Sequence, residues 1–128
     1  MKSDNEVNGA LSDNAGKVLE KRYLKKDDNG KIVETPADMF RRVAKNIATA
    51  DSYYEKNRDE VVRTEEEFYR MMSNLEFLPN SPTLMNAGRD LQQLSACFGL
   101  SIDDSMESIF ETSKDTAMIH KSGGGTGF

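Results

Sequence analysis

The chain has very little cysteine, no tryptophan and no long hydrophobic run. Its 128 residues contain one cysteine, Cys97, which cannot form a disulfide within the chain. We expect Cys97 to be either a small buried residue or a thiol that works with a partner elsewhere. No apolar run approaches the roughly 18 residues of a membrane span, and the first residues lack the apolar segment of a secretory signal. The sequence therefore predicts a cytoplasmic protein without a membrane partner.

Positive charges are fewer than negative charges. There are 17 Lys and Arg against 22 Asp and Glu, which gives a net charge of −5 and a pI near 4.9. An acidic chain is poorly suited to DNA, RNA or an anionic membrane surface, so a nucleic-acid polymer is not expected as a partner. Hydrophobic residues make up only 37% of the chain, which predicts a single modest core.

The pattern along the chain predicts three regions. Residues 1–14 are rich in Ser, Asp, Asn and Gly and are expected to form a flexible tail. Residues 15–76 are expected to be helical, with a small hairpin at the Asn29 and Gly30 turn signal. Residues 77–128 carry motif-bearing loops, a short strand and one further helix.

Two helix starts stand out in the helical region. Thr35 is placed to cap a helix with Pro36 at its first position, and an apolar stripe follows at helical spacing. The segment from Thr64 to Glu67 fits a capping box for the next amphipathic helix. Both helices are expected to serve packing.

The last third predicts a loop, a strand and a helix. Pro79 and Pro82 favour an ordered loop over residues 77–88, and residues 95–100 fit a buried strand. Asp104 is placed to cap a helix with Glu107 three residues on, and glycines 123–125 would end it. The residues expected on its inner face are Met106, Ile109, Phe110 and Ala117.

Taken one at a time, the motifs of the last third are weak. The glycine run over residues 121–127 lacks the Gly-Lys-Ser/Thr ending of a P-loop and the spacing of a dinucleotide fingerprint, so alone it indicates a helix stop or linker. Asp103, Asp104 and Ser105 alone indicate a helix cap. His120 stands apart from any cluster with metal-ligand spacing, and no bound metal is expected.

The joint order of these motifs is far more specific. Residues 77–88, 94–98, 103–109 and 120–128 together resemble the amino-terminal part of the ribonucleotide reductase catalytic chain, and are most similar to the adenosylcobalamin-dependent class II. Residues 17–23 and 36–44 resemble the segments that precede these motifs in class II members. The resemblance implies a mainly helical region followed by the first strand and helix of a ten-stranded α/β barrel. An iron-dependent class I relative stays possible.

The resemblance implies reduction of a ribonucleotide by radical chemistry. Cys97 matches the first of two cysteines that become a disulfide as they supply two reducing equivalents. Ser81, Ala96, Cys97 and Gly125 match positions that contact the substrate. The second cysteine and the cysteine that carries the radical belong to a carboxy-terminal part that this chain lacks. The chain alone is therefore not expected to be active, and an intein or split gene after Phe128 would explain the missing part.

The resemblance also implies regulation and partners. Asp104, Ser105 and Met106 match residues that hold a deoxynucleoside triphosphate effector near a dimer interface. The implied partners are the missing carboxy-terminal part, a thioredoxin-like or other dithiol reductant and, once complete, a second copy of the enzyme. Adenosylcobalamin is the implied cofactor, bound mainly by the missing part. A nucleotide-binding regulatory module without catalysis is the main alternative, and a vestigial fragment that binds nothing is the third.

Overall fold

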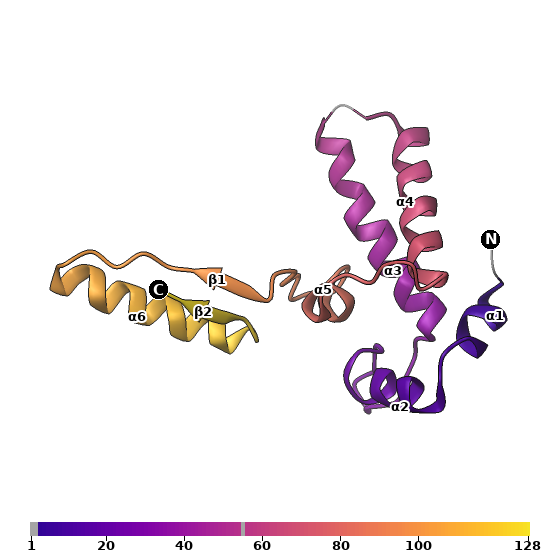
Figure 1. Cartoon of the computed structure of the whole chain (residues 1–128), viewed down its shortest axis with the longest axis horizontal. Helices are drawn as coiled ribbons and strands as arrows, with labels where there is room; N and C mark the ends of the chain where they lie inside the picture. Colours follow the sequence, from indigo (N-terminus) through magenta and orange to yellow (C-terminus); the bar gives the residue numbers. More distant parts are fainter. Residues whose placement is uncertain (1–2, 55) are drawn as a thin grey trace.

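The protein, described here from a computed structural model, consists of a helical body and a slender arm (Figure 1). The structure describes residues 3–54 and 56–128. The predicted class, mainly helical with a small β contribution, is confirmed. The elements are α1 (Asp4–Gly9), α2 (Asp13–Arg22), α3 (Pro36–Ala48), the 3₁₀ helix η1 (Thr49–Tyr54), α4 (Arg58–Ser73), α5 (Ser81–Asn86), β1 (Cys97–Gly99), α6 (Met106–Lys121) and β2 (Gly125–Gly127).

The first described residues form helices rather than the flexible tail expected over residues 1–14. Ser3 and Glu6 make a reciprocal capping box at α1, and Ser12 caps α2. Val7 of α1 is only 2% exposed and joins the core of the body. The composition suggested too little apolar surface for order, but caps and one buried side chain compensate locally. Residues 1 and 2 of the expected tail lie outside the described part.

The hairpin and the start of α3 agree with the sequence. Lys26 and Ile32 form a single antiparallel bridge, and Gly30 turns the chain with φ of 79°. Thr35 accepts a hydrogen bond from the Asp38 amide, and Pro36 is the first residue of α3. The hairpin is short: the Val33 amide donates to the Lys25 carbonyl, and the Asp27 amide donates to the Lys31 carbonyl, each at 2.9 Å.

The start of α4 was predicted wrongly. The helix begins at Arg58, capped by Asn57 in a reciprocal box with Glu60. Thr64 lies inside the helix, where its Oγ1 donates to the Glu60 carbonyl and to Asp51 of η1. Both segments fit the same capping pattern, and the earlier one gives α4 two more turns to pack against α3.

The core of the body lies where α3 packs against α4, with α1, α2 and α5 around them. The buried apolar cluster consists of Val7, Leu24, Ala37, Met39, Phe40, Val43, Ala44, Tyr69, Met72, Leu84 and Ala87. Helix α3 contributes five of these eleven residues, more than any other element, and four of them lie on the apolar stripe that its spacing predicted.

Residues 77–88 are not entirely a loop, because α5 forms within them. Asn80 caps α5 by accepting from the Thr83 amide at 2.8 Å. Pro82 lies in the first turn, where a proline needs no donor. The prediction of a loop took both prolines as helix breakers. Pro79 precedes the cap of α5 and Pro82 lies in its first turn, so neither interrupts the helix.

The arm is a β–α–β unit. Strands β1 and β2 pair in parallel, with Cys97 opposite Gly125 and Phe98 opposite Thr126. Helix α6 joins the strands, and Thr112 fixes it to the β1 side by donating to the Ser101 carbonyl at 3.1 Å. The strand expected over residues 95–100 is confirmed at Cys97–Gly99, but it is exposed or half-buried rather than buried.

Two details of α6 differ from expectation. Its cap is Ser105, which accepts from the Ser108 amide, and Asp104 lies one residue outside it. The predicted inner face is exposed: Met106, Ile109 and Phe110 are 62%, 41% and 66% accessible. The face turned to the strands carries the buried Thr112 and the half-buried Ile119, because two short strands cover only part of the helix. Gly123, with φ of 87°, follows the end of α6 as predicted.

None of the helices in residues 3–54 and 56–128 has the length and apolarity that a bilayer crossing requires. The cytoplasmic location stays a prediction.

Candidate functional site

The site begins at the uncovered face of the two-stranded sheet. Cys97 and Gly125 are direct partners in the parallel register, and the Gly125 amide donates to the Ala96 carbonyl at 2.7 Å. Along each strand the residues alternate between exposed and half-buried, so Cys97 and Gly125 share the exposed face while Phe98 and Thr126 share the face towards α6. The structure therefore brings together three of the predicted substrate residues.

The exposure of the thiol decides between the two expectations for Cys97. The side chain is exposed, so it is not a small buried residue. A thiol on an open strand can react with a ligand or another thiol, as nucleophilic or redox chemistry requires.

The glycine run shapes the entry to β2. A Cβ on Gly124 would lie 2.7 Å from Cγ2 of Ile119 and 2.8 Å from Cε2 of Phe98, so only a glycine fits there without a shift. A Cβ on Gly125 would meet only the Ala96 carbonyl, at 3.6 Å. The surface above Gly125 is thus open, and this chain does not itself require a glycine at that position.

Ser81 lies in the body, at the first turn of α5. Its Oγ is 2.8 Å from the Tyr23 hydroxyl, and its side chain is exposed. Helix α5 is joined to the segment before β1, because Thr83 Oγ1 donates to the Leu94 carbonyl at 2.8 Å and Asn86 Nδ2 donates to the Gln93 carbonyl at 2.9 Å. Figure 1 shows α5 between the body and β1. The helix that carries Ser81 is therefore anchored close to the strand that carries Cys97.

A buried ionic cluster, formed by Glu34, Arg42 and Arg89, holds α5 in place. The Glu34 carboxylate accepts from Arg42 Nε at 2.6 Å, from Arg42 Nη2 at 3.1 Å and from Arg89 Nη2 at 3.3 Å. Arg42 also donates to the carbonyls of Leu84 and Ala87 at the end of α5. One carboxylate thus links α3 to α5 and the residues after it.

The cluster keeps its carboxylate charged. Burial would raise the pKa of Glu34, but hydrogen bonds from Arg42 and from the Lys25 amide, with the charges of Arg42 and Arg89, outweigh burial and hold that pKa below its ordinary value. Sequence reasoning missed this cluster. The only sequence signal was the charge of Glu34 beside the predicted cap Thr35, which does not reveal partners 8 and 55 residues away.

The predicted effector residues lie at the other end of α6. Ser105 caps the helix, and Asp104 and Met106 beside it are exposed. A helix of 16 residues spans about 24 Å, and Figure 1 places its start at the tip of the arm. These residues are therefore separated from Cys97 and Gly125 by roughly the length of α6.

No group of three or more His, Cys, Asp or Glu side chains among the described residues is arranged to hold a metal ion. His120 instead pairs with Thr126, with 3.0 Å between Nε2 and Oγ1. That contact joins the end of α6 to β2.

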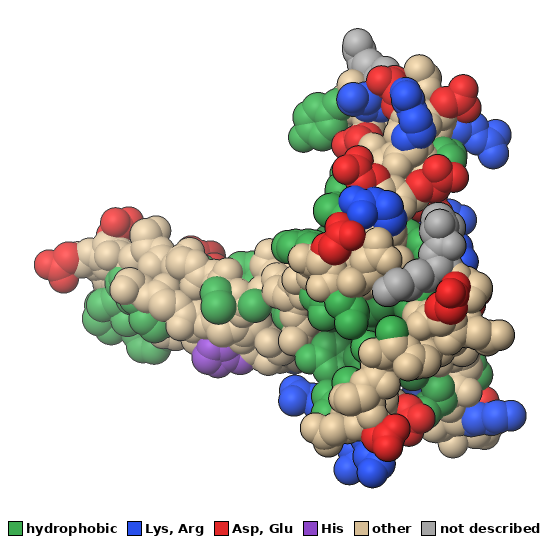
Figure 2. Space-filling view, turned by 45° about the vertical axis from the view of Figure 1, so that its right-hand side comes forward, with side chains coloured by type: hydrophobic (Ala, Val, Ile, Leu, Met, Phe, Trp, Pro, Cys, Tyr) green, Lys and Arg blue, Asp and Glu red, His purple; other side chains and the backbone are tan. Residues whose placement is uncertain are grey.

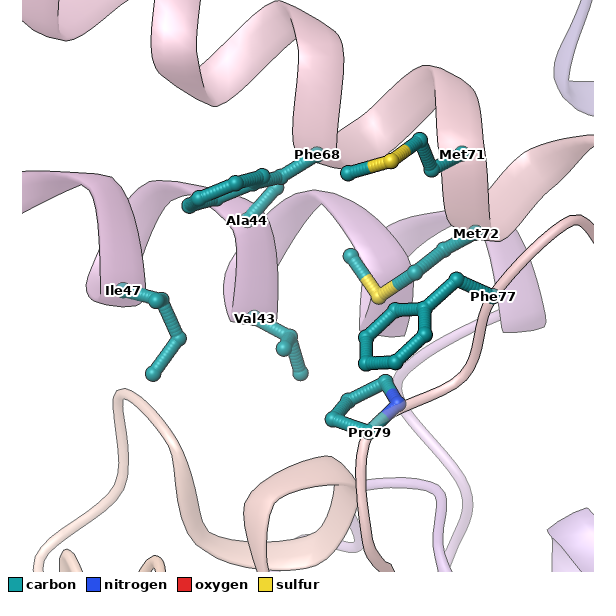
Figure 3. A pocket seen from close by; sticks show the side chains of 8 residues that line it. All are labelled: Val43, Ala44, Ile47, Phe68, Met71, Met72, Phe77 and Pro79. Atoms are coloured by element: carbon teal, nitrogen blue, oxygen red, sulfur yellow. The ribbon is translucent and has the colours of Figure 1, made fainter.

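An apolar cavity of about 110 Å³ lies in the body (Figure 3). Figure 3 shows that side chains of α3 and α4 line it together with the ring of Phe77 and with Pro79. The lining offers no charged or titratable group. The residues that line it are Val43, Ala44, Ile47, Phe68, Met71, Met72, Phe77 and Pro79. We therefore place the candidate site at the sheet and not in this cavity.

Comparison with protein families shows which family the chain belongs to. Residues 10–92 match the family described as ribonucleotide reductase, all-alpha domain, and residues 95–128 match ribonucleotide reductase, barrel domain. The chain belongs to the ribonucleotide reductase family. The helical body and the arm thus correspond largely to these two matched domains. The predicted boundary at residue 77 stays a prediction.

Individual relatives support the same family. The chain is 41% identical to the vitamin B12-dependent ribonucleoside-diphosphate reductase of Thermoplasma acidophilum, over 100% of this chain and 24% of the relative. It is 45% identical to the enzyme of that name from Mycobacterium tuberculosis strain CDC 1551, over 87% of this chain and 16% of the relative. The ribonucleoside-diphosphate reductase subunit alpha of Helicobacter pylori is 38% identical over 88% of this chain and 13% of the relative. The chain spans about a quarter or less of these relatives.

Proposed function

We propose that this chain is the amino-terminal part of a class II ribonucleotide reductase, in which Cys97 is the first cysteine of the redox pair. The second cysteine belongs to the remaining carboxy-terminal part, which the chain needs for activity. The observation that carries this proposal is the exposed Cys97 thiol beside Gly125 on the uncovered sheet face. The family match and the relatives named vitamin B12-dependent support it.

The proposed reaction replaces the 2′-hydroxyl of a ribonucleotide by hydrogen. The C–O bond at the 2′ carbon breaks and the oxygen leaves as water, while a C–H bond forms there. The two thiols lose two electrons and two protons in total and become a disulfide, which an external dithiol reduces by exchange. Ser81, Ala96 and Gly125 contact the nucleotide beside Cys97. Ser81 has a hydroxyl that can donate to a phosphate or sugar oxygen.

Adenosylcobalamin is the proposed cofactor because of the names of the B12-dependent relatives. When bound it supplies the radical. The described residues do not by themselves fit this group, because Cys97 is exposed on an open sheet face and His120 is engaged with Thr126. The cofactor therefore depends on the remaining part of the enzyme.

Asp104, Ser105 and Met106 form part of the proposed effector site for a deoxynucleoside triphosphate. They are exposed at the start of a 16-residue helix, whose amides favour an anion. Figure 2 shows hydrophobic side chains gathered near the tip of the arm. Met106, Ile109 and Phe110 are exposed there, which fits contact with the rest of the enzyme or with a second copy in a homodimer.

The test is Cys97→Ser in an enzyme assembled from this chain and the carboxy-terminal part, supplied with adenosylcobalamin, ribonucleotide and a dithiol. Sustained formation of deoxyribonucleotide is expected to stop, because a serine hydroxyl cannot form or exchange a disulfide. Ser113→Ala, on the exposed side of α6, is the control and should keep full turnover. Continued dithiol-driven turnover by Cys97→Ser would remove Cys97 from its role.

A further inference from the structure

Tyr23 and Ser81 form a hydroxyl pair across 58 residues of sequence. The Tyr23 hydroxyl oxygen lies 2.8 Å from Ser81 Oγ, a typical distance for a hydrogen bond between two hydroxyl groups. Either hydroxyl can be the donor. We propose that Tyr23 is a positioning residue, which fixes the Ser81 hydroxyl so that it donates to an acceptor oxygen of the bound nucleotide. This inference rests on the substrate role proposed above for Ser81.

The backbone on both sides of the pair is held by the same buried ionic cluster. The Tyr23 carbonyl accepts from Arg89 Nη2 at 2.8 Å, and the Tyr23 ring packs against the core. On the other side, Arg42 Nη2 donates to the Leu84 carbonyl of α5 at 3.1 Å. Glu34 binds both arginines, so the two hydroxyl groups are presented by segments tied to one carboxylate. The Ser81 hydroxyl is thereby oriented before any ligand arrives.

The chemistry of the ligand sets the direction of the hydrogen bond. A serine hydroxyl has one proton, and phosphate oxygens only accept. If Ser81 gives its proton to the nucleotide, its oxygen must accept from Tyr23. The result is a chain from the Tyr23 O–H through Ser81 to the nucleotide oxygen, in which each hydrogen bond strengthens the next. A phenol, which is a better donor than an alcohol, suits the first position of this chain.

Steady-state kinetics of the assembled enzyme test the proposal. Tyr23→Phe removes one oxygen and keeps the packed ring. It is expected to raise KM for the ribonucleotide about five-fold with kcat unchanged, because the lost hydrogen bond serves the bound substrate and the transition state equally. Ser81→Ala is also expected to raise KM. The double variant should be no worse than Ser81→Ala alone, since Tyr23 acts through Ser81.

Tyr53→Phe is the matched control, because Tyr53 is 83% exposed, and its KM should not change. If Ser81→Ala raises KM and Tyr23→Phe does not, the positioning role is overturned while the proposed function stands. If Ser81→Ala leaves KM unchanged, the substrate role of Ser81 fails and the positioning role fails with it. Additive effects in the double variant, or a loss of kcat that parallels a lower urea midpoint, would assign Tyr23 a structural role and overturn the inference.

Discussion

Removal of the Glu34 side chain is expected to destabilise the helical body by about 3 kcal/mol. The side chain is 6% exposed and binds two guanidinium groups and the Lys25 amide. Deleting one partner of a fully buried ion pair costs roughly 3–5 kcal/mol, because the remaining charge stays buried without compensation. Arg42 and Arg89 are 14% and 26% exposed and keep their backbone carbonyl acceptors, so the lower end of that range applies.

The assay is urea unfolding of the whole chain at neutral pH, followed by far-ultraviolet circular dichroism. Glu76→Ala is the control, because the Glu76 pair with Arg70 is about half exposed on both sides and surface pairs contribute about 0–1 kcal/mol. A loss below about 1 kcal/mol for Glu34→Ala would refute the view that this carboxylate organises the buried ionic cluster.

The pH dependence gives an independent check on Glu34. Its pKa is held below the ordinary 4.5, so the folded state favours the charged form. The stabilisation is therefore complete above the ordinary pKa and is lost as the pH falls through the lower pKa of the folded state. The difference in unfolding free energy between the wild type and Glu34→Gln should be constant near neutral pH and shrink only below pH 4.5. A difference that persisted unchanged at the acid end would contradict the assigned charge.

Two further outcomes are expected. Gly124→Ala should cost about 1–3 kcal/mol of local stability, because its Cβ would overlap Ile119 and Phe98. Hydrogen exchange of the β1 and β2 amides measures this loss. Gly127→Ala is the control and should show almost no loss, because no atom lies within 4 Å of its Cβ. Calorimetric titration of the isolated chain with a deoxynucleoside triphosphate should show no saturable binding, because residues 104–106 are exposed and make only part of the proposed site. Tight binding by the chain alone would favour the regulatory-module alternative instead.

Local signals predicted those parts of the fold that depend on neighbouring residues. Thr35 and Pro36 defined the start of α3 correctly, because a cap and a first-turn proline act within four residues. The predicted helix start at Thr64 was wrong, because Asn57 fits the same capping pattern seven residues earlier. The hydrogen bond from Thr64 to Asp51 depends on how the two segments pack, which the sequence does not show. Ser105 replaced Asp104 as the cap of α6, an error of one residue that sequence patterns rarely resolve.

In the candidate site, too, the sequence revealed some features, whereas others depend on how distant segments pack. The residues Cys97, Ala96 and Gly125 were named through the resemblance to a family, and spacing alone would not have paired positions 28 residues apart in parallel register. The partners of Ser81 and of Glu34 were invisible in the sequence, because Tyr23 and Arg89 reach them through packing of distant segments. The sequence therefore named candidate site residues, whose roles stay predictions, but it did not reveal the side chains that contact them.

The lone sulfhydryl of this molecule also makes it convenient to study. Since the chain has one cysteine and that cysteine is exposed, a fluorophore or spin label attached by maleimide chemistry would occupy a single known place, on the bare side of the β-sheet next to Gly125. Any polypeptide that docks over this side would change the emission or the mobility of the label. The sulfur atom that we propose for the redox reaction would then also carry a label that detects assembly of the enzyme.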